Sequence, residues 1–155
     1  MTQLVLLVVS TPRQEFHACV AVGSFKFKLL NMLADKKLKA FVPTIKPEEA
    51  KSFYKDVLGL KLLSQDDYAL EFESNGTLLR VTIVQELKPQ AFTVLGWNVD
   101  DIVSIIKSLN DENIFCEKYD FFEQNDLGIW TSPNGSKVAW FKDPDGNVLS
   151  LTEES

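Results

Sequence analysis

The sequence offers few side chains for nucleophilic or metal chemistry. It contains one histidine, His17, and two cysteines, Cys19 and Cys116, which form no Cys-x-x-Cys pair. A zinc site built from protein ligands needs several histidine, cysteine or carboxylate groups, so a histidine-rich zinc centre is disfavoured. No glycine-rich phosphate loop and no serine nucleophile motif occurs. Other polar and aromatic side chains must therefore supply any chemistry.

Arg80 is the main candidate among the charged residues. A guanidinium is a permanent cation, and in a cavity it could hold a carboxylate, a phosphate or an enolate-like oxygen with two hydrogen bonds. The alternative is a structural ion pair with Glu71 or Glu73 across a hairpin. Both interpretations remain open.

Trp130 and Trp140 are the aromatic candidates. An indole ring provides a flat apolar surface together with one polar N–H group, which suits stacking against a ligand. Packing in the core is the alternative for both residues. Trp97 falls on the helix side of its predicted strand, so we expect it in the core.

These candidates lie within a unit of one strand, one helix and three strands. Residues 40–45 form the first predicted strand. The helix starts at Pro47, where a helix tolerates proline, and ends at Gly59. Its apolar residues recur with helical spacing. Three further strands are expected over 60–64, 68–73 and 77–84, and Asn75-Gly76 predicts a tight hairpin.

The same order of elements repeats in the second half. Residues 92–99 form a strand, and Asp100 or Asp101 caps the following helix. The remaining predicted strands are 114–119, 128–131, 137–141 and 148–152, which is one more than the unit requires. Repetition of a supersecondary unit implies that the two copies share one sheet surface.

Alternation along the strands sorts the side chains between two faces. The face opposite the helices is predicted to carry Ala40, Val42, Thr44, Arg80 and Thr82 in the first copy, and Val94, Gly96, Asn98, Ser150 and Thr152 in the second. A mixed polar face of this kind favours a concave ligand site. The predicted ligand-binding residues are Thr44, Arg80, Asn98, Trp130, Trp140 and Ser150.

Two motifs resemble the vicinal oxygen chelate superfamily, which includes glyoxalase I, bleomycin resistance proteins and dioxygenases. They are Phe53-Tyr-Lys-Asp-Val-Leu-Gly-Leu60 and Phe141-Lys-Asp-Pro-Asp-Gly-Asn-Val-Leu-Ser-Leu151. The resemblance implies an α+β fold in which two βαβββ modules form a curved, mixed eight-stranded sheet with helices on the convex face. The modules would span 40–86 and 91–153 in a single domain, residues 39–155.

Metal enzymes of that superfamily place ligands on the first and last strands of each module. The resemblance assigns these positions to Ala40, Arg80, Val94 and Ser150. Alanine and valine cannot bind a metal, serine is a poor ligand, and arginine is a fixed cation. We therefore expect neither a metal nor another cofactor.

Residues 1–38 precede the repeat and contain a short apolar run over 4–9. An added strand, an arm packed on the domain, and a start codon placed before a true start at Met32 remain open interpretations. A signal peptide is disfavoured because no basic region precedes the run.

Composition limits the partners. The formal net charge of −6 argues against a nucleic-acid binder, and no apolar run is long enough to cross a membrane. Unpaired cysteines favour a reducing, cytoplasmic location, and the resemblance implies a homodimer.

The leading hypothesis is a metal-independent protein that binds a small anionic or oxygen-rich aromatic molecule. The alternatives are a lyase, isomerase or dioxygenase-like enzyme that uses Arg80 or an unrecognised metal site, and a non-catalytic interaction module.

Overall fold

The computed structural model describes residues 33–155, and residues 36–155 form one compact unit. The predictions for the N-terminal extension, including His17 and Cys19, lie outside the described residues. Within 33–155, no helix has the length and apolar character needed to cross a membrane.

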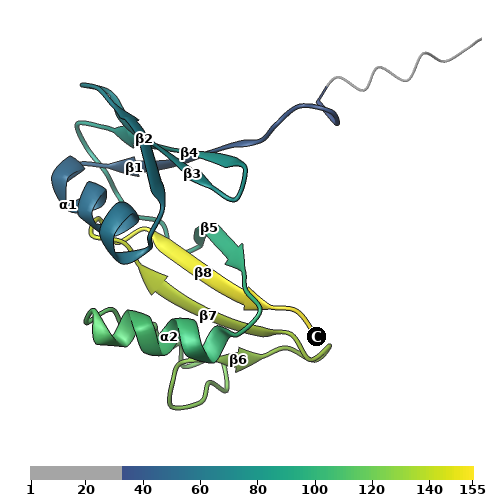
Figure 1. Cartoon of the computed structure of the whole chain (residues 1–155). Coiled ribbons are helices and arrows are strands. Elements are labelled where there is room, and N and C mark those ends of the chain that lie inside the picture. The colour runs from purple at the N-terminus through teal and green to yellow at the C-terminus, as the bar shows by residue number, and fades with distance from the viewer. Residues whose placement is uncertain (1–32) are drawn as a thin grey trace, which may run out of the picture. The chain divides into compact units, whose positions relative to one another are not determined.

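The first module has the predicted order of one strand, one helix and three strands (Figure 1). Strand β1 (Lys39–Thr44) leads into helix α1 (Pro47–Ser52), which continues as the π-helical turn η1 (Phe53–Val57). Strands β2 (Lys61–Gln65), β3 (Ala69–Ser74) and β4 (Thr77–Ile83) follow. The sheet order is β1-β4-β3-β2, with β1 parallel to β4 and the other pairs antiparallel.

The second module repeats this order and confirms the predicted repeat. Strand β5 (Thr93–Asn98) is followed by helix α2 (Ile102–Asp111), whose N-cap residue Asp101 accepts a hydrogen bond from the Ser104 amide. Strands β6 (Trp130–Thr131), β7 (Lys137–Lys142) and β8 (Val148–Glu153) complete the sheet in the order β5-β8-β7-β6.

The strand predicted over 114–119 is absent, which removes the surplus strand of the second copy. The segment is joined to β7 through a hydrogen bond from the Glu117 amide to the Trp140 carbonyl, at 2.7 Å. A single bond of this kind does not make a ladder. The α+β class and the two βαβββ modules are confirmed, as two four-stranded sheets whose strands β1 and β5 are neighbours.

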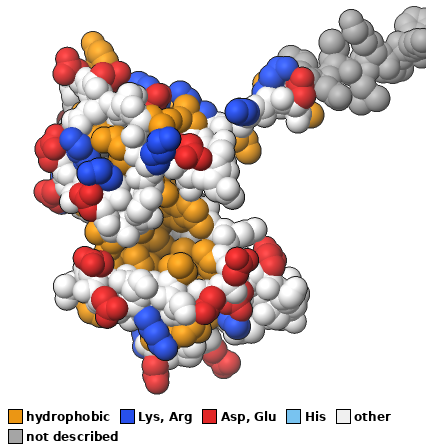
Figure 2. All heavy atoms as spheres, in the orientation of Figure 1, with side chains coloured by type: hydrophobic (Ala, Val, Ile, Leu, Met, Phe, Trp, Pro, Cys, Tyr) orange, Lys and Arg blue, Asp and Glu red, His pale blue; other side chains and the backbone are white. Residues whose placement is uncertain are grey.

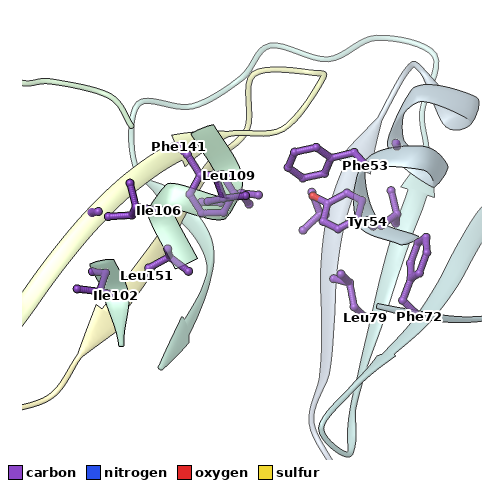
Figure 3. Close-up of a cluster of buried hydrophobic side chains, with 14 of the residues drawn as sticks. Phe53, Tyr54, Phe72, Leu79, Ile102, Ile106, Leu109, Phe141 and Leu151 are labelled. Atoms are coloured by element: carbon purple, nitrogen blue, oxygen red, sulfur yellow. The ribbon is translucent and has the colours of Figure 1, made fainter. Parts of the chain in front are cut away.

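One apolar core draws side chains from both modules (Figure 3). Phe53 and Tyr54 come from η1, and Phe141 comes from β7 in the second module. The Phe53 and Phe141 rings lie 6.5 Å apart. The helix-covered faces of the two sheets are therefore buried together.

The turn between β7 and β8 joins the modules through hydrogen bonds. The Asn147 side-chain amide donates to the Pro43 carbonyl at 2.9 Å, and the Thr44 hydroxyl donates to Asp145 at 2.5 Å. The Tyr54 hydroxyl donates to Asp143 at 3.0 Å. The Asp-Pro-Asp-Gly-Asn motif is thus a structural clasp between the two copies.

The register of β1 corrects the predicted faces of that strand. Val42 pairs with Val81 and is fully buried in the core, whereas Phe41 pairs with Arg80 and is 59% exposed. Because paired residues point to the same face of a sheet, Ala40, Val42 and Thr44 lie on the helix side. The open face, defined as the sheet face opposite the helices, carries Phe41 and Arg80.

Candidate functional site

Arg80 lies on the open face of the first sheet and forms an ion pair with Glu71. Its Nη1 is 2.8 Å from Glu71 Oε1, and Lys39 Nζ contacts the same oxygen at 3.0 Å. Hydrogen bonds from Lys39 and Arg80 hold the pKa of Glu71 below its usual range. The structural ion pair considered for Arg80 is therefore present, and ligand binding by Arg80 stays a prediction.

Thr44 does not belong to the open face, and that part of the prediction is wrong. The residue is fully buried. Its hydroxyl donates to Asp145 and accepts a hydrogen bond from the Lys46 amide at 2.9 Å. The Thr44 hydroxyl therefore takes part in the clasp and binds the backbone amide just before α1.

The positions that would bind a metal in relatives do not form a donor set here. Ala40 packs against the core, on the face opposite Arg80. Val94 lies at a register shift in β5 and has no donor atom. Among residues 33–155, no group of three or more His, Cys, Asp or Glu side chains could hold a metal ion. The described side chains therefore do not fit a metal at this locus.

Ser150 lies on the open face of the second sheet, between Gly96 on β5 and Trp140 on β7. A Cβ atom at position 96 would lie 2.4 Å from the Ser150 hydroxyl oxygen, so the close approach requires glycine there or a rotation of the serine. Asn98 is exposed two residues further along β5. Of these two polar residues, Ser150 is the one that pairs with Trp140, which belongs to a larger aromatic surface.

That surface is an aromatic cluster, defined as Tyr119, Phe121, Phe122, Trp130 and Trp140. The Phe122 ring stacks on Trp140 with centroids 5.2 Å apart and an interplanar angle of 1°. Tyr119 meets Trp140 edge to face at 5.6 Å, and Trp130 lies 4.7 Å from Phe122. Such geometries are favoured between aromatic rings. The rings of the cluster therefore support one another on the open face of the second sheet.

A small depression of about 150 Å³ lies beside Trp140. We call it the aromatic hollow; its lining is Ala91, Phe92, Thr93, Tyr119, Phe121, Phe122, Trp140 and Val148. Phe92 and Phe121 are 63% and 76% exposed, although both are large apolar side chains. The Trp140 indole N–H donates to the Thr93 hydroxyl at 3.1 Å. An exposed apolar site of this kind is typical of ligand recognition.

Sequence reasoning found Trp140 but missed the other aromatic walls of the hollow. Trp130 contacts the Phe122 ring but does not line the hollow. Tyr119 is the last residue of the strand predicted over 114–119, and Phe121 and Phe122 follow it. The available signal was the dense aromatic run Tyr-Asp-Phe-Phe at 119–122.

A second depression of about 390 Å³, the adjoining hollow, shares Ala91, Tyr119 and Val148 with the first. Lys142 contributes a cation to its lining. The Lys142 ammonium lies 2.7 Å from Glu117 Oε2, and this hydrogen bond raises the pKa of Lys142. Burial raises the pKa of Tyr119, so its phenol stays protonated at neutral pH.

The notch between the modules differs from these hollows in its chemistry. It comprises depressions of about 470 and 210 Å³ that share Ser74, Trp97 and Asn98. Trp97 donates to Ser74 across it at 3.2 Å. Figure 2 shows the apolar atoms within the notch, whose linings contain no charged side chain. Asn98 therefore belongs to the notch, separate from the aromatic hollow.

Comparison with protein families assigns the fold. The model of the Glyoxalase/Bleomycin resistance protein/Dioxygenase superfamily matches residues 38–151. The comparison with curated protein sequences gives no match.

Solved structures with the same fold share little sequence with this chain. A lactoylglutathione lyase from Agrobacterium tumefaciens is 16% identical with a TM-score of 0.61, over 77% of this chain and 93% of that chain. A superfamily member from Sphaerobacter thermophilus is 20% identical with a TM-score of 0.60, over 76% and 96% of the two chains. A glyoxalase family protein from Enterococcus faecalis is 22% identical with a TM-score of 0.56, over 76% and 94%. At these identities the likeness establishes the fold alone.

Proposed function

The chain belongs to the Glyoxalase/Bleomycin resistance protein/Dioxygenase superfamily, and we propose that it binds a small aromatic molecule in the aromatic hollow without the help of a metal. One observation carries the proposal: five aromatic side chains surround a single depression on the open face of the second module. They are Phe92, Tyr119, Phe121, Phe122 and Trp140. The volume of about 150 Å³ suits one six-membered ring with its substituents.

Burial of an aromatic ring supplies the binding free energy. Transfer of apolar surface from water contributes roughly 25 cal/mol per Å². Edge-to-face and stacked contacts with the walls add about 0.5–1.5 kcal/mol for each ring pair. Because Phe122 and Tyr119 already contact the Trp140 ring, this residue needs little further ordering when a ligand binds.

Binding is favoured over catalysis by the state of Glu71 on the open face of the first sheet. A general base needs a pKa near the operating pH and free access to the proton that it removes. Glu71 instead has a lowered pKa and is hydrogen-bonded to Lys39 and Arg80. It is therefore a weak base in this arrangement.

Two indole groups provide a test with an internal control. In ¹H–¹⁵N spectra titrated with phenol and benzyl alcohol, the Trp140 indole signal should shift because Trp140 lines the hollow. The Trp97 indole donates to Ser74 in the notch and should not shift. Assignment follows from single Trp→Phe variants.

The matched variants are Phe92→Ala and Phe115→Ala. Both side chains are 63% exposed, but only Phe92 lines the aromatic hollow. Loss of Phe92 should weaken binding about fivefold or more, consistent with one lost aromatic contact, whereas Phe115→Ala should leave the affinity unchanged. Equal effects of the two substitutions, or a Trp140 signal that stays fixed with both compounds, would refute the proposal.

A further inference from the structure

The two neighbouring hollows indicate more about the ligand than its aromatic ring. Resting on the proposed function, we infer that the ligand is an aromatic acid, whose ring enters the aromatic hollow and whose carboxylate is bound by Lys142 in the adjoining hollow. Lys142 is then the residue that determines specificity for an anion.

The adjacency of the two depressions is the first reason. Ala91, Tyr119 and Val148 line both of them, so the two depressions are neighbours on the surface and one molecule that reaches past these shared residues can contact both. The aromatic hollow has room for a ring, and the adjoining hollow, at about 390 Å³, is larger than a carboxylate requires. A short chain between ring and carboxylate therefore fits the available space.

The polar side chains of the adjoining hollow provide the second reason. Lys142 and Trp140 lie two residues apart on β7 and so point to the same face of the sheet. The ammonium of Lys142 has three N–H donors, and the observed bond to Glu117 uses one. Tyr119 adds a phenol to the lining, and its raised pKa keeps it a hydrogen-bond donor.

The Glu117 pair does not prevent this role. The side chains of Lys142 and Glu117 are 45% and 34% exposed. Ion pairs with this exposure contribute little to stability, because water screens them. A ligand carboxylate can thus share the ammonium with Glu117, and removal of the negative charge of Glu117 should strengthen anion binding.

The experiment compares 3-phenylpropionate with the neutral 3-phenylpropionamide in calorimetric titrations and in the Trp140 indole assay. The full chain is used as wild type, Lys142→Met, Glu117→Gln and Lys137→Met. Lys137 is the matched control, because it lies on the same strand, is 42% exposed and pairs with Glu153 at 2.5 Å. It lines neither hollow.

We expect Lys142→Met to weaken 3-phenylpropionate binding about tenfold, as expected for a lost charge-assisted hydrogen bond. Its effect on the amide should be less than about twofold, since the amide carries no charge to be lost. Glu117→Gln should strengthen acid binding, and Lys137→Met should leave it unchanged.

The outcomes separate the two proposals. If acid and amide bind alike in wild type and in Lys142→Met, while the Trp140 signal still shifts, ring binding stands and the acid assignment is wrong. If neither compound nor the neutral single-ring compounds shift the Trp140 signal, the proposed function fails, and the acid assignment fails with it. Equal loss of acid binding in Lys137→Met would show a general charge effect and would also overturn the role of Lys142.

Discussion

Removal of one hydroxyl from the clasp tests whether the β7–β8 turn holds the modules together. The Tyr54 hydroxyl donates to Asp143 Oδ2 at 3.0 Å, and Tyr54 is fully buried. The Asp143 carboxylate accepts three other hydrogen bonds, from the amides of Asp145 and Asn147 and from the Asn147 side chain. Burial raises the pKa of Asp143, and these donors oppose that rise. Tyr54→Phe removes one of four donors from a buried acid.

The expected loss follows from this geometry. The phenylalanine ring keeps the contacts of Tyr54 with Phe53 and Phe72, whose centroids lie 5.1 and 5.7 Å away. Packing therefore changes little, and the main effect is one lost hydrogen bond to a charged group, which costs about 1.5–3 kcal/mol. We expect the free energy of unfolding to fall by about 2 kcal/mol.

Urea denaturation followed by tryptophan fluorescence measures this loss. The midpoint should decrease while the m-value stays constant, because the surface exposed on unfolding is the same. Tyr68→Phe is the control, since Tyr68 is 72% exposed and should change stability by less than about 0.5 kcal/mol. A loss for Tyr54→Phe as small as that of the control would refute the assignment of the clasp.

Two further predictions concern titrating groups. Burial raises the pKa of the Cys116 thiol to about 11, so in a Cys19→Ser variant a disulfide reagent at pH 8 should label Cys116 on the order of 100 times more slowly than free cysteine; a rate close to that of free cysteine would contradict this. Because the folded-state pKa of Glu71 is lowered, its ion pairs stabilise the fold above the ordinary glutamate pKa, and this contribution is lost as the pH falls through the folded-state value. Urea midpoints measured from pH 6 to pH 3 should therefore fall less steeply in Glu71→Gln than in wild type, and parallel curves would count against the pairing.

Local signals explain why the modules could be predicted from sequence. Pro47 and Gly59 bound the first helix, and Asn75-Gly76 forms the hairpin, with both residues at positive φ. These features depend on neighbours in the sequence and need no tertiary contact. The prediction of a strand over 114–119 was wrong because a strand depends on tertiary contacts. Extended residues become a strand only when a partner strand supplies a ladder of hydrogen bonds.

The faces of β1 could not be read from alternation because both sides of the strand are apolar. Phe41 and Ile45 are 59% and 47% exposed, although their side chains suggest burial. The parallel pairing with β4 decides the matter, since Val42 lies beside the core residue Val81. That contact joins residues 39 positions apart in sequence, so the residues next to Val42 in the sequence do not indicate it. Thr44 was misplaced by the same error.

The candidate site was only partly predictable for a related reason. Trp140 lies on a regular strand and pairs with Ser150, which alternation correctly places on the face opposite the helices. Its neighbours in the aromatic hollow come largely from the loop over 119–122 and from residues 91–93 before and at the start of β5. Loop side chains have no periodicity, so their convergence on Trp140 depends on the path of the chain through space.

Position 150 differs in chemistry from the metal-binding form of the motif that the resemblance implies. Ser150 occupies the position where the resemblance places a carboxylate ligand, and Trp140 is its partner on the adjacent strand. On the first sheet, Arg80 and Lys39 share one oxygen of Glu71, and among residues 33–155 no group of three or more His, Cys, Asp or Glu side chains could hold a metal ion. Asp143 and Asn147 of the same motif form the clasp between the modules. Their hydrogen bonds to Tyr54 and to the Pro43 carbonyl do not involve the side chain at position 150. A substitution at position 150 is therefore compatible with the fold, and under the proposed function the aromatic cluster and Lys142 are the groups that would select the ligand.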